Sequence, residues 1–474
     1  MKRIVTMFLV LTLVLSLCAC AGGGEKTPEG LLVGYSRQSI MPDDTVPNRS
    51  VGLGGYSNAE KRMSTGFLDY IYTTCIAFTY GDETILLFTE DLIGKGQKMT
   101  GLTRAAITEA TGIPGDHIMA SGTHTHAGPD TNISKNDEYK EMFIKVSVKA
   151  AVEALANRVP ATIAATNVQT EGMNFTRHYL ENDGAVTSSN MGNITYDKVV
   201  DHACTPDNEM VLYKFDREGN NQDVVLMNWA AHPCASDTEG SSGTVISADY
   251  IGSIRTAFEK ETGMQFAFFQ GGGGNMVTDS RIKEKAHGME DRVEYGTALA
   301  KIAIEALPTM EEIPCDGIQI AQTNLKYAKK RHQDAELYEK AKEVMKVFKS
   351  ANAEAANVLA REMGFLNKSH AQDVANHYGE PEDGIMELNS FRIGDVAFTT
   401  TPWETFSDTS VWIKDNSPYK YTMVLSIANN RIGYQATKEA FGYVCYESLS
   451  SSFAAGAAEA AAEQLVNMLK DFQK

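Results

Sequence analysis

Residues Val224 to Pro233 have the sequence Val-Val-Leu-Met-Asn-Trp-Ala-Ala-His-Pro. The apolar run has the length of a strand buried on both faces, and Pro233 ends it directly after a histidine. Residues 265–274 repeat this plan, because Gln-Phe-Ala-Phe-Phe reads as a second buried strand and leads into Gln270 and four glycines. Residues 249–261, between the two strands, have helical spacing. This order of strand, helix and strand predicts an α/β fold.

The same mixed pattern continues on both sides of this core. Further strands are predicted at 75–80, 84–89, 117–121, 396–400 and 422–426, and further helices at 97–110, 140–155, 292–306 and 453–469. Residues 334–361 form the longest helical stretch, and their apolar pattern is too short for a coiled coil, so we expect a packed hairpin or excursion. We therefore predict a mixed β-sheet core flanked by helices. It occupies residues 31–474 and has no second-domain boundary.

Composition and charge narrow the class of protein. The formal net charge is −18 and no basic stripe occurs, which argues against a nucleic-acid partner. Five cysteines follow residue 20, an odd number with wide spacing and no Cys-x-x-Cys motif. This pattern does not indicate a disulfide framework, although one pair would be compatible with it. The sequence gives no indication of an oligomeric state.

The N-terminal residues 1–20 are predicted to be a signal peptide. Lys2 and Arg3 precede an apolar run that is too short to span a bilayer, and the run ends in Leu-Cys-Ala-Cys. This ending resembles a bacterial lipobox, in which Cys20 would carry the lipid and residues 21–30 would form a flexible tether. We therefore expect an extracytoplasmic protein that is anchored to the membrane by its lipid. The alternative is an ordinary cleaved signal with an incidental cysteine.

Polar residues that can bind metal follow several of the predicted strands. Sites in α/β folds collect at the carboxyl ends of strands. His124 and His126 follow the strand at 117–121, and in an extended segment residues two apart point to the same side, so both rings are expected to face one cavity. The other candidates, each near a later strand end, are His232, Glu404 and Tyr434.

Each of these candidates also has a structural explanation. The two histidines could be hydrogen-bonded loop residues, His232 a core histidine, Glu404 a residue favourable to a helix start, and Tyr434 part of a turn. Together they supply imidazole nitrogens, a carboxylate and a phenol, a set that suits zinc. A catalytic zinc ion keeps one position for water and lowers the pKa of that water towards neutrality.

The order of these motifs and their residue sequences resemble those of the neutral/alkaline ceramidase family of zinc amidases. The resemblance runs from about residue 31 to 451. The matching runs are Asp91-Leu92, Thr123-His-Thr-His-Ala-Gly-Pro129, Asn174 with Arg177, Ala231-His-Pro233, Ser247-Ala-Asp-Tyr250, Gln270-Gly-Gly-Gly-Gly274, Pro402-Trp-Glu404, Asn429 to Tyr434 and Tyr446-Glu447-Ser448. The resemblance implies hydrolysis of an amide bond in an N-acylated lipid such as ceramide.

The resemblance also implies roles for individual residues. The zinc ligands would be His124, His232, Glu404 and Tyr434, with Tyr434 also close to the reaction. His126 would face the substrate and protonate the leaving amine. Arg177 would hold a substrate oxygen, although a structural role is the alternative.

Two departures from the family pattern affect the predicted substrate. The family carries an active-site serine after its glycine run, and here that position is Val277, with Asn275 in place of the family's aspartate. A valine cannot donate a hydrogen bond, so either Asn275, Thr278 or the backbone N–H groups of Gly271 to Gly274 take over the polar role, or the substrate differs. Within the glycine run, Gly273 and Gly274 are the candidates for substrate binding. A tight, closely packed turn is the alternative for the glycine run. The extra immunoglobulin-like domain of the larger family members is also expected to be absent.

Three hypotheses follow from these observations. The first is a zinc-dependent amidase that acts on a ceramide-like lipid. The second is a zinc hydrolase for a different substrate, such as a peptide, another amide, an ester or a glycan-linked molecule, and Val277 motivates it. The third is a surface-tethered lipoprotein that binds a small molecule or lipid without catalysis.

Overall fold

The computed structural model describes residues 30–474 except 44, 47–48, 57–58, 60–61, 192–193, 195, 236–242, 280–290 and 351. The predicted signal peptide, Cys20 and the tether up to residue 29 lie outside the described residues. Within the described part, none of the helices combines the length and apolar character needed to cross a membrane. The five cysteines after residue 20 are all free thiols in the structure.

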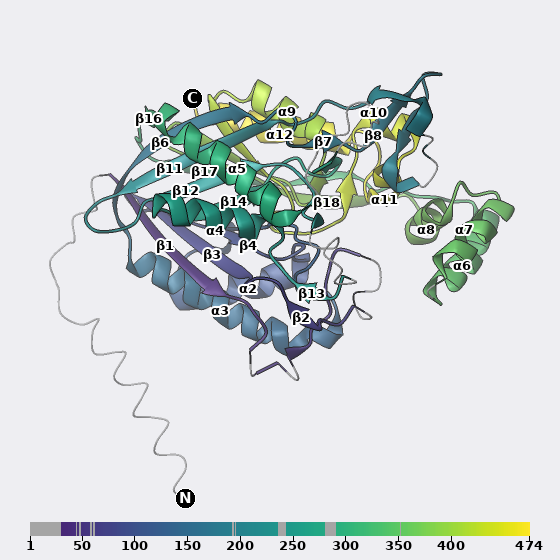
Figure 1. The fold of residues 1–474 in the computed structure, drawn as a ribbon, viewed down its shortest axis with the longest axis horizontal. Coiled ribbons are helices and arrows are strands. Elements are labelled where there is room, and N and C mark those ends of the chain that lie inside the picture. The colour runs from purple at the N-terminus through teal and green to yellow at the C-terminus, as the bar shows by residue number, and fades with distance from the viewer. Residues whose placement is uncertain are drawn as a thin grey trace, which may run out of the picture.

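A large mixed sheet forms one half of the molecule (Figure 1). Its strands lie in the order β14 (Gln265–Gln270), β12 (Val224–Trp229), β11 (Glu209–Arg217), β6 (Val159–Gln169), β1 (Leu31–Ser39), β3 (Tyr72–Tyr80), β4 (Glu83–Glu90) and β5 (Ile118–Gly122), and β16 (Glu311–Ile313) pairs with β6. The pairs β12–β14 and β4–β5 are parallel, and the other neighbours are antiparallel. Each parallel pair brings two carboxyl strand ends to the same edge of the sheet.

A second sheet packs face to face against the first. Its strands lie in the order β17 (Ile318–Ala328), β18 (Asp383–Ile393), β19 (Val396–Thr400) and β21 (Tyr421–Leu425). Both sheets contribute side chains to one apolar core. In this core the rings of Tyr213 and Phe398 lie 5.2 Å apart, and the Tyr213 hydroxyl donates to the Ala397 carbonyl across the interface. The hydroxyl is thus satisfied although it is buried.

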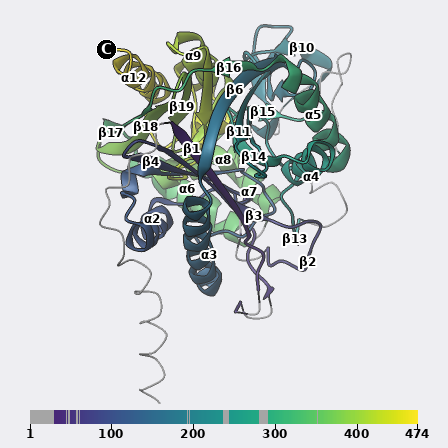
Figure 2. The same cartoon turned by 90° about the vertical axis from the view of Figure 1, so that its left-hand side faces the viewer.

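Helices cover the outer faces of both sheets, which gives an α/β/β/α arrangement (Figures 1 and 2). The helices α2 (Gln97–Thr111) and α3 (Asp137–Ala156) pack on the β1, β3, β4 and β5 side of the main sheet, and α4 (Tyr250–Thr262) and α5 (Arg292–Ala306) pack at its β12 and β14 end. The second sheet is covered by α9 (Ser407–Asn416) and α12 (Ala457–Asp471). The predicted mixed α/β fold is confirmed.

Three helices form an excursion between β17 and β18, away from the sheets in Figure 1. They are α6 (Ala335–Lys349), α7 (Ala353–Glu362) and α8 (Lys368–His377), and they have an apolar core of their own. The predicted excursion is thus confirmed, with the single stretch at 334–361 divided into two helices. Asp373 ties α8 to the body, because its carboxylate accepts from Lys330 Nζ at 2.7 Å and from His332 Nε2 at 3.0 Å.

Shorter elements surround the ends of the strands. They are β2 (Gly66–Phe67) with β13 (Val245–Ile246), β7 (Phe175–Thr176) with β15 (Met276–Val277), the sheet of β8 (His178–Glu181), β9 (Val186–Ser188) and β10 (Val199–His202), β20 (Glu404–Thr405) with β22 (Tyr434–Gln435), α10 (Lys438–Tyr443) and α11 (Tyr446–Ser450). Single 3₁₀ turns occur at Gly115–His117, Ser134–Asn136, Ser189–Met191, Tyr196–Lys198 and Leu307–Thr309.

Candidate metal centre

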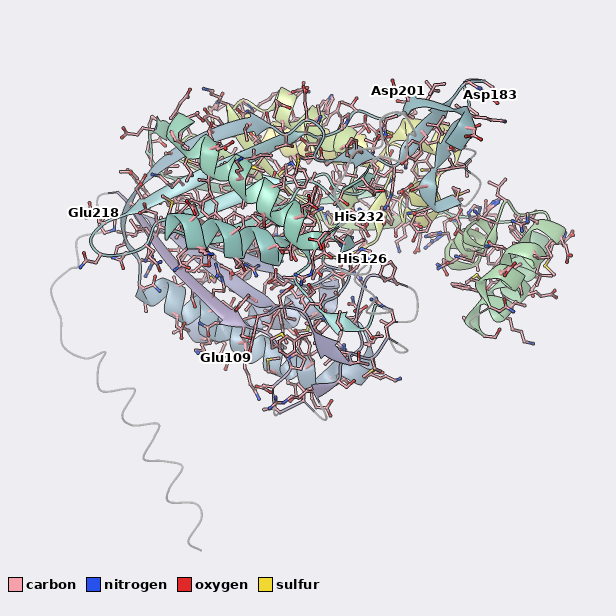
Figure 3. All side chains as sticks on the ribbon, viewed as in Figure 1. Glu109, His126, Asp183, Asp201, Glu218 and His232 are labelled. Carbon is pink, nitrogen blue, oxygen red and sulfur yellow. The ribbon has the colours of Figure 1, made fainter. Side chains whose placement is uncertain are left out.

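The predicted ligands meet where strands of both sheets end. His124 follows β5, His232 follows β12, and Glu404 begins β20 just after β19. β20 pairs in parallel with β22, and this register places Glu404 directly opposite Tyr434. Figure 3 shows His126 and His232 next to each other, between the sheets and the excursion, and their ring centroids lie 5.6 Å apart.

The backbone of His124 is not extended. The expectation that an extended segment brings the rings of His124 and His126 to the same side is therefore wrong. His124 has φ = 70°, in the left-handed region that non-glycine residues seldom adopt. Its N–H donates to the Leu92 carbonyl at 3.0 Å and its Nδ1 to the Ile93 carbonyl at 2.9 Å. The rings of His124 and His126 still approach to 5.0 Å, at a nearly perpendicular angle. Backbone conformations of this kind concentrate at functional sites.

The protonation of the two proposed histidine ligands is fixed by backbone carbonyls. His232 Nδ1 donates to the Gly273 carbonyl at 2.7 Å, as His124 Nδ1 does to Ile93. Each Nδ1 therefore carries the proton, and each Nε2 is left with a lone pair when the ring is neutral. Burial and then the Arg177 charge lower the pKa of His232, which keeps that ring neutral.

Both free nitrogens face the same carboxylate oxygen. Nε2 of His124 and Nε2 of His232 each lie 3.2 Å from Oε2 of Glu404. His124 Nε2 and Glu404 Oε2 are buried and have no hydrogen-bond partner within the described part of the chain. Two nitrogen lone pairs and a carboxylate oxygen repel one another unless a cation lies between them. The residues present therefore fit a divalent metal ion with nitrogen and oxygen ligands, as zinc has.

Tyr434 completes this group of candidate ligands. Its hydroxyl lies 3.3 Å from His232 Nε2 and accepts from Arg177 Nη2 at 3.2 Å. Burial and then the Glu404 charge raise the pKa of Tyr434 well above its usual range. A cation at this place would act in the opposite direction, because it favours the phenolate form.

His126 lies beside the ligands and lines a cavity. Its two ring nitrogens are buried and without a hydrogen-bond partner among the described residues. A ring nitrogen of His126 also lies within 4.8 Å of one from His124 and one from His232, so a role as a third imidazole ligand is geometrically open. Burial and then the two neighbouring histidines lower the pKa of His126 well below its usual range. Gly55 packs against this ring, and a β-carbon there would lie 2.5 Å from Cγ of His126.

The glycine run is a closely packed turn. The N–H of Gly273 donates to the Gly271 carbonyl at 2.7 Å and the N–H of Gly274 to Thr405 at 2.7 Å, so neither is available to a substrate. A β-carbon on Gly273 would lie 2.1 Å from Nε2 of Gln270. The geometry therefore agrees with the packing alternative for both glycines rather than with the predicted substrate-binding role.

Asn275 and Val277, the two residues that depart from the family pattern, lie in different surroundings. Asn275 is fully buried, and its Oδ1 accepts from the Ser407 N–H at 2.8 Å. Asn275 does not line the cavity, so the structure does not bring its amide to the place predicted for it. Val277 and Thr278 do line the cavity, which places an apolar and a hydroxyl side chain near the histidines.

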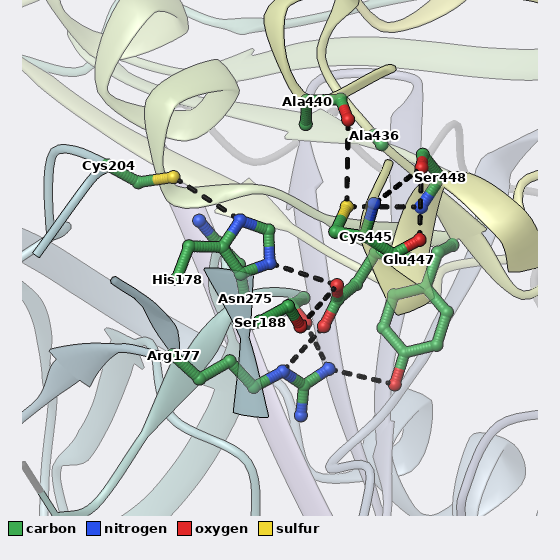
Figure 4. Close-up of polar contacts among 12 residues, drawn as sticks. Arg177, His178, Ser188, Cys204, Asn275, Ala436, Ala440, Cys445, Glu447 and Ser448 are labelled. Atoms are coloured by element: carbon green, nitrogen blue, oxygen red, sulfur yellow. Dashed lines mark hydrogen bonds and ion pairs between the residues drawn. The ribbon is translucent and has the colours of Figure 1, made fainter. Parts of the chain in front are cut away.

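Arg177, His178 and Glu447 form a buried cluster of charged residues (Figure 4), and Arg177 joins this cluster to the Tyr434 hydroxyl. The Glu447 carboxylate accepts from Arg177 Nε at 2.7 Å and from His178 Nε2 at 2.9 Å. Burial alone would raise the pKa of Glu447, but the Arg177 and His178 charges hold it well below its usual range. Burial likewise opposes the charge on His178, but Glu447 raises the pKa of His178 to about 9. His178 is thus a cation at neutral pH.

The cavity beside these residues has a volume of about 470 Å³, within the range of small-molecule sites. His126, His232, Tyr434 and Arg177 form part of its wall. The remaining wall comes from distant segments, including the excursion, and consists of Gly55, Tyr56, Tyr179, Ser189, Asn190, Cys234, Ala235, Val277, Thr278, Asp279, Lys368, Ser369 and Tyr446.

Two parts of this site have no clear signal in the sequence. His178 was not singled out, and Glu447 entered only as part of a matching run. Adjacent Arg177 and His178 followed much later by an acidic residue is too common a pattern to indicate a buried ion pair. The contribution of Lys368 and Ser369 from the excursion has no local signal at all.

Fold and site together define an α/β/β/α protein with a buried histidine–carboxylate centre suited to a metal. No protein-family model matches the chain, and no curated protein sequence matches it. Its fold is similar to that of neutral ceramidase from Pseudomonas aeruginosa, with a TM-score of 0.68, 15% identity, and coverage of 94% of this chain and 75% of that one. A ceramidase complexed with C2 matches with a TM-score of 0.67, 15% identity, and coverage of 94% and 76%. The predicted resemblance is thus confirmed at the level of the fold.

Proposed function

We propose that this protein is a zinc-dependent hydrolase that cleaves the amide bond of an N-acylated, ceramide-like lipid. The observation that supports it most is the convergence of the His124 and His232 lone pairs on the Glu404 carboxylate. The shared fold with ceramidases supports the choice of substrate class. When bound, zinc would polarise the scissile carbonyl and make a water molecule nucleophilic at neutral pH.

The residues of the chain would divide the remaining work. His124, His232, Glu404 and Tyr434 would hold the ion. His126, neutral and on the cavity wall, would accept a proton from the attacking water and donate one to the leaving amine nitrogen. Without this proton the amine would have to leave as an amide anion, which is a poor leaving group. The proton transfer is therefore needed for the bond to break. Arg177 lines the cavity and could orient a carbonyl, although its Nε is already engaged with Glu447 and its Nη2 with Gly274 and Tyr434.

The direct test combines metal analysis with hydrolysis. The full-length protein should contain about one zinc per chain and release fatty acid from a labelled short-chain ceramide. The double variant His124→Ala plus His232→Ala should lose both properties, and His370→Ala, on the excursion, should retain them. Absence of stoichiometric zinc from the wild-type protein would reject the proposal. Zinc without turnover of any substrate would instead favour the non-catalytic binding lipoprotein.

A second candidate is a zinc hydrolase for a more polar substrate. The cavity wall favours it, because Ser189, Asn190, Thr278, Asp279 and Lys368 all line the space next to Val277. A polar substrate that fills this space could form hydrogen bonds with the wall, whereas an alkyl chain could form none. A panel of N-acyl amino acids, esters and N-acetylated sugars, run beside ceramide, decides between the two by relative kcat/KM.

We further propose that the protein is held outside the cytoplasm by a lipid on Cys20. The lipobox-like sequence supports this placement. Radiolabelled palmitate should be incorporated into the wild-type protein and not into Cys20→Ser, which should appear in the soluble fraction. Equal labelling of the two proteins would reject the anchor.

A further inference from the structure

Arg177, Glu447 and His178 form a buried ion cluster that lies directly against the candidate ligand Tyr434. Arg177 and Glu447 have 5% and 0% of their surfaces exposed, and His178 has 0%. Burying three charges is costly unless each is paired and hydrogen-bonded. Structural stability alone does not require such a cluster, because apolar residues of similar size can replace a buried ion pair at little cost.

The cluster touches the metal centre through one guanidinium nitrogen. Arg177 Nη2 donates to the Tyr434 hydroxyl at 3.2 Å and to the Gly274 carbonyl at 2.8 Å. It therefore connects the candidate ligand Tyr434 to the loop that carries the Gly273 carbonyl, which in turn orients His232. Glu447 holds the other edge of the guanidinium through Nε at 2.7 Å, so the plane of Arg177 is fixed from both sides.

We propose that Glu447 is a positioning residue that acts through Arg177 on the Tyr434 hydroxyl, so that this oxygen is held ready for the metal ion. Glu447 is not among the residues that line the cavity, and its carboxylate is hydrogen-bonded to Arg177 and His178 and, within the described part of the chain, not to a candidate ligand. It belongs to α11, and its neighbour Tyr446 lines the cavity against the Tyr434 ring, with centroids 5.6 Å apart. The same short helix thus supports Tyr434 by ring packing and, through Arg177, by charge.

His178 makes the net charge of the cluster positive. With Glu447 ionised and both Arg177 and His178 cationic, the cluster carries one net positive charge behind the Tyr434 oxygen. A positive charge next to a phenol favours its ionised form, in which the oxygen is the better metal ligand. The second oxygen of Glu447 accepts from His178 Nε2 at 2.9 Å, which keeps the carboxylate from rotating away from Arg177. Ser188 Oγ lies at the limit of hydrogen-bond distance from the same oxygen, at 3.4 Å, and is not needed to hold it.

The experiment uses the full chain with Co²⁺ in place of zinc, because the visible absorption of cobalt reports on its ligands. Since the inference rests on the proposed function, turnover and metal binding are read separately. We expect Glu447→Gln to change the cobalt spectrum. Zinc affinity and kcat should each fall by about 10- to 100-fold. KM should change far less than kcat. Ser188→Ala, which removes only the 3.4 Å contact, is the matched control and should match the wild type.

A double-mutant cycle separates positioning from simple stabilisation. If Glu447 acts through Tyr434, Glu447→Gln should have little further effect on kcat and metal affinity in a Tyr434→Phe background. A merely structural glutamate would instead give additive losses. Glu447→Asp keeps the charge on a shorter side chain, and it replaces Glu447→Gln throughout if the latter does not fold.

Each outcome has a definite meaning. An unchanged cobalt spectrum and kcat in folded Glu447→Gln or Glu447→Asp overturns the positioning role, and so does full additivity with Tyr434→Phe. If the wild type binds cobalt but turns over no amide, the proposed function fails. The positioning role then still stands if the spectrum responds to Glu447→Gln and not to Ser188→Ala.

Discussion

A β-carbon on Gly274 would lie 2.6 Å from the main-chain carbonyl oxygen of Glu404. This distance is below any normal contact, so the glycine permits the close approach of its loop to the strand that presents the carboxylate. Gly274→Ala should push β20 away and displace Glu404 from the two histidines. We expect at least about tenfold weaker zinc binding, measured by competition with a chelator. Gly101→Ala, where a β-carbon meets open space, should bind zinc like the wild type.

The two histidines of the Thr123–Pro129 run should respond differently to the same change. His124→Gln should lose zinc, because its Nε2 faces Glu404 and its Nδ1 is held by Ile93. His126→Gln should keep zinc and lower kcat by about 10²- to 10⁴-fold, as expected for loss of a general acid–base group. Elemental analysis and kinetics on both variants check this prediction. Loss of zinc from His126→Gln would make His126 a ligand instead.

The His178–Glu447 pair should make stability depend on pH in the alkaline range. Because the pKa of His178 is raised to about 9 in the folded protein, its contribution is complete below the unfolded value of about 6.5 and is lost as pH rises through 9. The full contribution is up to about 3 kcal/mol. Denaturant unfolding of metal-free protein at pH 6 and pH 9 measures it. The wild type should lose more stability over this interval than His178→Gln, and parallel losses would contradict the assignment.

Asp373 should control how firmly the excursion closes the cavity. Burial opposes its charge, but His332, His377 and Lys330 hold the pKa of Asp373 well below its usual range, so the carboxylate is ionised at neutral pH. Asp373→Asn leaves Lys330 without its charge partner and should loosen α8, which carries the cavity residues Lys368 and Ser369. We expect faster proteolysis within α6–α8 and a higher KM, with kcat changed less.

The control for this prediction is Glu336→Gln. Its ion pair with Lys340 is largely exposed, with 81% of the glutamate side chain accessible, so its loss should change neither proteolysis nor KM. Equal proteolysis of Asp373→Asn and wild type would show that the Asp373 ion pairs do not hold the excursion in place.

Much of the fold was predictable because apolar runs and helical spacing are local properties. The strand at 224–229, the helix at 292–306 and the strand at 396–400 have the predicted bounds. The last helix begins at Ala457 instead of 453, because Phe453 pairs with Lys329 in an isolated bridge and Gly456, with φ = 95°, precedes the first turn. The long strand β17 was missed, because one of its faces is only half-buried and the other is exposed, which leaves no continuous apolar run in the sequence.

The site was predictable in its residues more than in its geometry. His232 and Glu404 follow buried strands, and this position can be read from the sequence. The left-handed backbone of His124 cannot, because it depends on carbonyls of Leu92 and Ile93 that the fold brings to it. The engagement of the Gly274 N–H and the pairing of Glu447 with Arg177 likewise arise from contacts between segments far apart in the chain.

The excursion takes the place of the turn in a β-hairpin whose two strands are paired along their full lengths. β17 and β18 pair without interruption from Ile318 with Ile393 to Ala328 with Asp383, where the excursion departs. The entropic cost of closing a loop at such a point changes little with the length of the inserted segment. The hairpin is therefore a natural grafting point, at which residues 329–382 can be shortened, exchanged or redesigned while the sheets keep their register. Recognition can in this way diverge, in evolution or in the laboratory, on a scaffold whose chemistry stays constant.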